Sequence, residues 1–173
     1  AGGKALFDMA NQRKEPIPVF AEMGSVNPVY LMPKKLEQSA EEIAVQYAGS
    51  ITLGVGQFCT NPGIIIGIKG ESFDRFAHAL SAEIAKVPAG NMLHAGIQKA
   101  YDEKRATALA QQGIGLVASG LETTAPSQAV ATIAAVSGFV FLANPLLHQE
   151  VFGPFTLLVQ CASFEEMQRV ASI

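Results

Sequence analysis

The chain has 173 residues, a length that suits one domain or one part of a larger protein. Hydrophobic residues make up 49 % of it and charged residues 16 %, which excludes a disordered chain. The formal net charge of −3 offers no basic surface, so we expect no nucleic-acid partner. Two cysteines cannot build a disulfide framework, and we expect a reducing compartment, the cytoplasm.

Two long uncharged stretches, residues 43–68 and 123–149, exceed the roughly 20 residues that a membrane-spanning helix needs. Gln, Asn and Pro residues interrupt both stretches, and no cluster of Lys or Arg flanks either one. Strands that are buried on both faces also read as continuous apolar runs. We therefore interpret the stretches as the interior of an α/β protein and expect no membrane partner.

Apolar spacing and the Gly and Pro breaks predict helices and strands that alternate along the chain. In chain order we predict a helix over 3–11, an extended run over 19–21, a strand over 29–32, a helix over 34–50, an irregular segment over 54–63, a strand over 64–68, a helix over 73–86 with Ser72 as its N-cap, a helix over 95–112, strands over 114–118 and 129–136, a segment over 138–147 that fits helix or strand, a strand over 155–161 and a helix from 164 to 173. This alternation predicts an α/β fold with a mostly parallel, twisted sheet flanked by helices.

Cys59 is the residue with the most chemical information. Gly, Gln, Asn and Pro residues surround it over 54–63, and backbone N–H groups in such a loop can activate a thiol and later bind an oxyanion. A buried, inert cysteine is the structural alternative, although a core strand is not built from such residues. Cys161 lies in the apolar run 157–161 and is predicted to be a core residue.

Two carboxylates border turns. Glu22 comes after an apolar extended run and before Met-Gly-Ser, which suits a general base. Glu150 precedes Val-Phe-Gly-Pro, where a carboxylate can accept hydrogen bonds from a sugar diol. Either residue can equally be a solvated surface charge.

The three histidines, His78, His94 and His148, are scattered along the chain. None of them has a spacing to a cysteine or to another histidine that is typical of a metal site, so we expect no metal.

Three segments together resemble the aldehyde dehydrogenase superfamily. Residues 20–28 (Phe-Ala-Glu-Met-Gly-Ser-Val-Asn-Pro) resemble the signature around the family's catalytic glutamate. Residues 56–60 (Gly-Gln-Phe-Cys-Thr) resemble its catalytic cysteine signature, and residues 150–154 match its Glu-x-Phe-Gly-Pro motif. The motifs also follow one another in the family's order. The residues of the first two motifs look most like those of the branch of NADP-dependent fatty aldehyde and 2-oxoglutarate semialdehyde (2,5-dioxopentanoate) dehydrogenases.

The sequence departs from the family pattern at two positions. Ser25 stands where the family usually has a second glycine, and Gly54 stands where it usually has an asparagine. The resemblance also implies that residues 1–173 are a single catalytic domain, cut from a longer protein. The cofactor-binding half, with the asparagine that helps to bind the oxyanion, is then expected upstream, and the bridging strand used for oligomerisation downstream.

The resemblance implies a mechanism and a role for each residue. Cys59 attacks the aldehyde, and Glu22 activates the water that hydrolyses the resulting thioester to an acid. Glu150 holds the nicotinamide ribose of NADP or NAD, and Phe152 contacts the nicotinamide. The implied partners are the aldehyde, the missing cofactor-binding domain and further copies of the intact protein in a homo-oligomer.

Two other interpretations remain at this point. A cysteine hydrolase would use Gln57 as an oxyanion donor and would need a histidine beside Cys59. A catalytically silent structural or interaction domain is the second alternative, because half of the implied cofactor site lies outside the sequence. The isolated chain is expected to be inactive and to bind the cofactor weakly.

Overall fold

A five-stranded sheet forms the centre of the molecule. The computed structural model describes residues 2–123 and 125–173. The strand order is β1-β2-β7-β6-β4, and all neighbours are parallel except β4 and β6. The strands are β1 (Pro28–Leu31), β2 (Ile64–Ile68), β7 (Phe155–Cys161), β6 (Thr132–Ser137) and β4 (Gly115–Ser119), and a small ribbon pairs β3 (Gly90–Asn91) with β5 (Gln128–Ala129).

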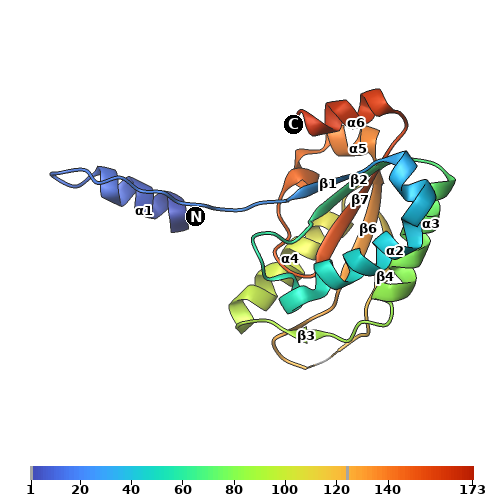
Figure 1. The fold of residues 1–173 in the computed structure, drawn as a ribbon. Helices are drawn as coiled ribbons and strands as arrows, with labels where there is room; N and C mark the ends of the chain where they lie inside the picture. Colours follow the sequence, from blue (N-terminus) through green and yellow to red (C-terminus); the bar gives the residue numbers. More distant parts are fainter. Residues whose placement is uncertain (1, 124) are drawn as a thin grey trace.

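Helices cover both faces of this sheet (Figure 1). One face packs against α2 (Pro33–Thr52) and α3 (Glu71–Ile84), and the other packs against α4 (Ala95–Leu109), α5 (Gly138–Ala143) and α6 (Phe164–Ala171). Strand β2 shows why two cores form, because successive side chains of a strand point to opposite faces. Ile65 belongs to the α2/α3 core, while Ile64 and Ile66 belong to the other.

This architecture confirms the predicted α/β class, with several corrections in detail. The strand predicted over 114–118 is β4, and it runs antiparallel at the edge of the sheet. The strand predicted over 129–136 is divided into β5 and β6. The ambiguous segment 138–147 is helical: α5 is followed by a short 3₁₀ helix, η2 (Pro145–His148).

The predicted N-cap Ser72 is wrong. Helix α3 begins at Glu71, with Gly70 in the N-cap position and an extended φ of 159°. Ser72 therefore lies in the first turn, where Glu71 and Asp74 complement the positive end of the helix dipole. Side-chain N-caps are found on other helices: His94 caps α4, and Ser163 caps α6.

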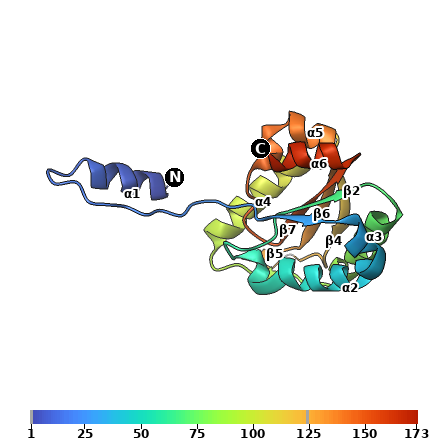
Figure 2. The same ribbon diagram turned by 45° about the horizontal axis from the view of Figure 1, so that its top comes forward.

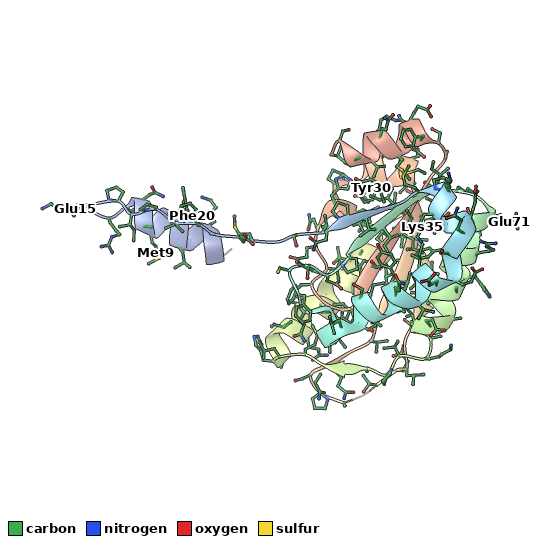
Figure 3. All side chains as sticks on the ribbon, viewed as in Figure 1. Met9, Glu15, Phe20, Tyr30, Lys35 and Glu71 are labelled. Carbon is green, nitrogen blue, oxygen red and sulfur yellow. The ribbon has the colours of Figure 1, made fainter. Side chains whose placement is uncertain are left out.

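Residues 2–27 form an arm that extends away from the sheet (Figures 1 and 2). The arm contains α1 (Gly2–Asn11), which confirms the first predicted helix. Residues 19–21 form no strand, so Glu22 does not follow one. Apolar side chains of the arm are exposed, with Phe20 97 % and Met9 65 % accessible, and Figure 3 shows both far from the sheet.

Within residues 2–123 and 125–173, no helix combines the length and apolar character that crossing a bilayer demands.

Candidate active site

The three motif segments meet at one edge of the sheet. Residues 22–27 precede β1, residues 57–63 precede β2, and residues 150–154 precede β7. These three strands are parallel, so the segments gather at their amino ends. Open α/β sheets usually bind ligands at the carboxyl ends of their strands. The motif segments of this chain lie at the opposite, amino-terminal ends.

A left-handed backbone leads into the cysteine turn. In the 3₁₀ segment η1 (Leu53–Gly56), Gly54, Val55 and Gly56 have φ values of 51°, 58° and 63°. Glycine adopts this conformation readily, whereas a β-branched valine is strained there by roughly 1–2 kcal/mol. The chain then reverses at residues 58–61, closed by the Asn61 N–H donating to the Phe58 carbonyl at 3.1 Å.

Two side chains hold the peptide group of Cys59. Ser25 Oγ and Asn27 Nδ2 each donate to the Cys59 carbonyl oxygen at 2.5 Å. Asn27 itself has a positive φ of 40°, a conformation that asparagine tolerates better than most residues. Within the described residues the Cys59 N–H makes no hydrogen bond, and Cys59 is exposed. The carbonyl is therefore fixed on the side of residues 25–27 while the N–H and the thiol remain accessible.

The carboxylate of Glu150 lies beside the glutamate motif. A Cβ added to Gly24 would stand 2.8 Å from Glu150 Oε2, so the carboxylate rests against the bare backbone at Gly24. Lys104 Nζ donates to the Glu150 carbonyl at 3.0 Å, which ties this segment to α4. Phe152 is half-buried and borders two hollows, one with His94 and Lys104 and one facing the cysteine turn.

Gly153 is the point at which the Glu150 segment and the cysteine segment touch. Gly153 has a φ of 148° and no side chain, so the ring of Tyr101 can pack directly against its backbone. A Cβ added to Gly153 would stand only 2.3 Å from Tyr101 Cδ2. A Cβ on Gly56 would in turn stand 2.3 Å from the carbonyl carbon of Gly153. Asn61 Nδ2 donates to the Gly153 carbonyl at 3.2 Å. Each glycine is therefore required by a close approach of other groups.

Tyr101 fixes the far side of this junction. It is buried, and its hydroxyl donates toward the carbonyls of Val130 at 2.7 Å and Pro154 at 3.3 Å. Burial raises the pKa of Tyr101 to about 12, so the phenol stays neutral at ordinary pH.

Glu22 is exposed on the arm, three residues before Ser25. The segment that carries it is joined to Cys59 through Ser25 and Asn27, but no hydrogen bond or ion pair of the described residues involves the Glu22 side chain. Glu22 thus belongs to the segment whose Ser25 and Asn27 donate to the Cys59 carbonyl, while its own carboxylate is not held by a hydrogen bond among the described residues.

Cys161 lies in the core, as predicted. It is fully buried on β7, and burial, followed by the nearby charge of Glu166, raises the pKa of its thiol to about 11. The two thiols therefore occupy opposite environments, one exposed on a turn and the other sealed in the interior.

The hydrolase alternative finds no support in the geometry. The amide of Gln57 is engaged locally, because Nε2 donates to Gly54 O and Oε1 accepts from Leu93 N. His94 Nδ1 is used to cap α4, and His148 Nε2 pairs with the Phe141 carbonyl. Across the described residues, no hydrogen bond joins a histidine to Cys59.

Sequence reasoning missed several residues of the site. Asn27, Asn61 and Tyr101 carry its hydrogen bonds, and Ser25, noted only as a departure from a pattern, donates to the Cys59 carbonyl. Asn and Ser beside Gly and Pro signal turns, but their partners lie far away along the chain. Tyr101 is one apolar-stripe position of a helix, and nothing local marks it.

Comparison with known proteins gives a consistent result. The model of the aldehyde dehydrogenase family matches residues 3–172. An alpha-ketoglutaric semialdehyde dehydrogenase 2 from Azospirillum brasilense is 43 % identical over 169 residues, 98 % of this chain and 32 % of the relative. An alpha-ketoglutaric semialdehyde dehydrogenase from Acinetobacter baylyi is 42 % identical over 159 residues, 91 % of this chain and 30 % of the relative. The chain thus spans about a third of the length of these relatives.

Solved structures agree on the fold. Proline utilization A from Bradyrhizobium japonicum, in a mutant form, superposes with a TM-score of 0.76 at 17 % identity, over 98 % of this chain and 17 % of that one. A putative aldehyde dehydrogenase from Burkholderia cenocepacia gives a TM-score of 0.74 at 18 % identity, over 95 % of this chain and 35 % of that one.

Proposed function

Because the chain belongs to the aldehyde dehydrogenase family, we propose that the complete protein oxidises an aldehyde to a carboxylic acid with NADP or NAD as the acceptor. The observation that carries this proposal is the meeting of three segments at one sheet edge, with Ser25 and Asn27 bonded to the Cys59 carbonyl and Glu150 resting against Gly24. Two relatives are named for alpha-ketoglutaric semialdehyde, so we take a semialdehyde that bears a carboxylate as the substrate class.

The residues of the Glu150 segment suit the nicotinamide end of such a cofactor. Gly24 leaves no side chain over Glu150 Oε2, and this carboxylate can accept hydrogen bonds from a ribose diol. Phe152 supplies an aromatic face at the rim of the same junction. When bound, the cofactor supplies a hydride acceptor, and the chain's own residues supply the nucleophile, the base and the positioning.

The proposed chemistry begins at Cys59. Its thiolate attacks the aldehyde carbon, and the carbonyl π electrons move to the oxygen, which the free Cys59 N–H can stabilise. Loss of hydride from that carbon, as the oxygen re-forms its double bond, leaves a thioester on Sγ. Glu22 then takes a proton from a water whose oxygen attacks the thioester, and the thiolate leaves as the acid forms. The Glu22 side chain is exposed, which leaves its carboxylate open to water.

We extend the proposal to the organisation of the whole protein. Residues 1–173 would form its catalytic domain, with the cofactor-binding half of the same protein before them and a bridging strand after them. Exposed apolar side chains on the arm, among them Leu6, Met9 and Phe20, support a covering partner domain. We also propose a homo-oligomer in the cytoplasm, and an isolated 173-residue chain without turnover.

The test compares two cysteine variants in the full-length protein, supplied with 2,5-dioxopentanoate and NADP. Cys59→Ala should abolish NADPH formation while leaving the melting temperature near that of the wild type. Cys161→Ala is the matched control: it should retain turnover but lose roughly 1 kcal/mol of stability, as small core truncations do. Near-normal turnover by Cys59→Ala would refute the proposed role of Cys59 as the nucleophile. An inactive wild type would instead support the alternative of a catalytically silent domain.

A further inference from the structure

Asn61 links all three motif segments, and it does so with three different groups. Its N–H closes the cysteine turn on the Phe58 carbonyl at 3.1 Å. Its carbonyl accepts from Asn27 Nδ2 at 3.1 Å, which reaches the glutamate segment. Its Nδ2 donates to Gly153 O at 3.2 Å, which reaches the Glu150 segment. Asn61 therefore bonds to the segment of the proposed nucleophile, to the segment of the proposed base and to the segment proposed to bind the cofactor.

Two other hydrogen bonds lie beside the Asn61 side-chain bond: Thr156 Oγ1 donates to the Pro62 carbonyl, and the Leu157 N–H donates to the Gly63 carbonyl at 3.0 Å. Both join residues after the turn to β7 and leave residues 150–154 without a bond. Within the described residues the Asn61 side-chain bond is the one hydrogen bond that joins the turn 58–61 to the segment 150–154. Both segments are irregular, so no ladder of backbone bonds fixes their spacing before β2 and β7 begin. The backbones of Gly56 and Gly153 also come into close contact. That contact limits how close the segments come, whereas the Asn61 amide keeps them together.

The chemistry of the site favours an amide at position 61. Gly153 O is an acceptor and needs a donor, which asparagine supplies and aspartate, when ionised, does not. Asn61 Oδ1 is inaccessible and finds no partner among the described residues, so the amide is held by its Nδ2 side. An aspartate would place one charged oxygen against the Gly153 carbonyl and the other in this unpartnered position, both unfavourable.

We propose that Asn61 is a positioning residue, which sets the distance between the Cys59 turn and the Glu150–Phe152 segment and thereby aligns the aldehyde carbon with the hydride acceptor. The inference rests on the proposed function. Its consequence follows from the steep dependence of rate on alignment, where a displacement of about 1 Å can cost on the order of 100-fold.

The experiment uses Asn61→Asp and Asn61→Ala in the full-length protein, with Ser163→Ala as the matched control. Ser163 lies at the start of α6, after the carboxyl end of β7 and therefore away from the site. Its Oγ accepts a hydrogen bond from Glu166 N. All three variants lose one side-chain hydrogen bond. Turnover with 2,5-dioxopentanoate and NADP is measured together with the melting temperature and with hydrogen exchange of the peptide that covers residues 150–155.

We expect Asn61→Asp to lower kcat/KM for NADP by about tenfold or more, with Asn61→Ala less affected, and Ser163→Ala to stay within about twofold of the wild type. Exchange over 150–155 should accelerate in both Asn61 variants and not in Ser163→Ala. Wild-type kinetics in Asn61→Asp, or unchanged exchange over 150–155, would overturn the inference. An inactive wild type would instead count against the proposed function, and the exchange comparison would still decide whether Asn61 couples the two segments.

Discussion

A single methyl group at Gly56 should separate the cysteine turn from the Glu150 segment. The Cβ of Gly56→Ala would stand 2.3 Å from both C and O of Gly153, and 2.6 Å from Pro154 N. These are backbone atoms, so no side chain can rotate away, and reaching the 3.0 Å below which real contacts essentially never fall requires a shift of about 0.7 Å. The φ of 63° adds roughly 1–2 kcal/mol for a residue with a Cβ, and overpacking adds about 1–3 kcal/mol.

Gly49→Ala is the matched control for this substitution. Gly49 lies near the end of α2, is exposed, and has nothing within 4 Å of an added Cβ. Replacing a helical glycine with alanine at such a site should stabilise the protein by about 0.5–1 kcal/mol.

The assay is urea unfolding combined with steady-state turnover of the full-length protein. We expect Gly56→Ala to lose about 2–5 kcal/mol of unfolding free energy and, where it remains folded, to lose about tenfold or more in kcat. Gly49→Ala should keep full turnover. If Gly56→Ala matched Gly49→Ala in both stability and rate, the close packing of the two segments would be refuted.

Three further predictions concern titration and partial reactions. Glu22→Gln should keep a rapid burst of NADPH in stopped-flow measurements while the steady state slows, because thioester hydrolysis needs the base; equal loss of both phases would contradict this role. Burial raises the pKa of Tyr101 from its ordinary value of 10.0 to about 12, so its stability contribution is intact below pH 10 and is lost as the pH rises toward 12. The free energy of unfolding, measured by urea titration, should therefore fall by about 2–3 kcal/mol over this range, and Tyr101→Phe should flatten the fall. Iodoacetamide near pH 8 should label Cys59 but not Cys161, whose thiol has a pKa of about 11; labelling of both in the folded chain would contradict the assigned environments.

Local pattern predicted the elements well where burial dominates. The run Ile64–Ile68 and the run Phe155–Cys161 are strands with the predicted bounds, because both are buried on two faces in the middle of the sheet. The edge strand β4 and the divided strand β5/β6 were harder, since strand direction and breaks depend on partners far away in the sequence. Ser72 is not the cap because the chain turns into the helix two residues earlier, at Gly70, another residue type that N-caps accept.

The site shows the same division. The resemblance predicted that Cys59 and Glu150 belong to one site, and in the structure both of their segments contact residues 24–27. Nothing local could show that Ser25 would bond to a carbonyl 34 residues away, or that Asn61 would donate to one 92 residues away. Such contacts are set by strand order, which brings the loops before β1, β2 and β7 together.

The central claim is that Cys59 carries the acyl group between oxidation and hydrolysis. Its most direct test is peptide mass spectrometry of full-length Glu22→Gln, mixed with 2,5-dioxopentanoate and NADP and quenched in acid. We predict that the peptide containing Cys59 gains the mass of the acyl group as a thioester, and that omitting NADP or replacing Cys59 with alanine removes the adduct. An adduct on another residue, or continued acid production by the Cys59→Ala protein, would contradict the account.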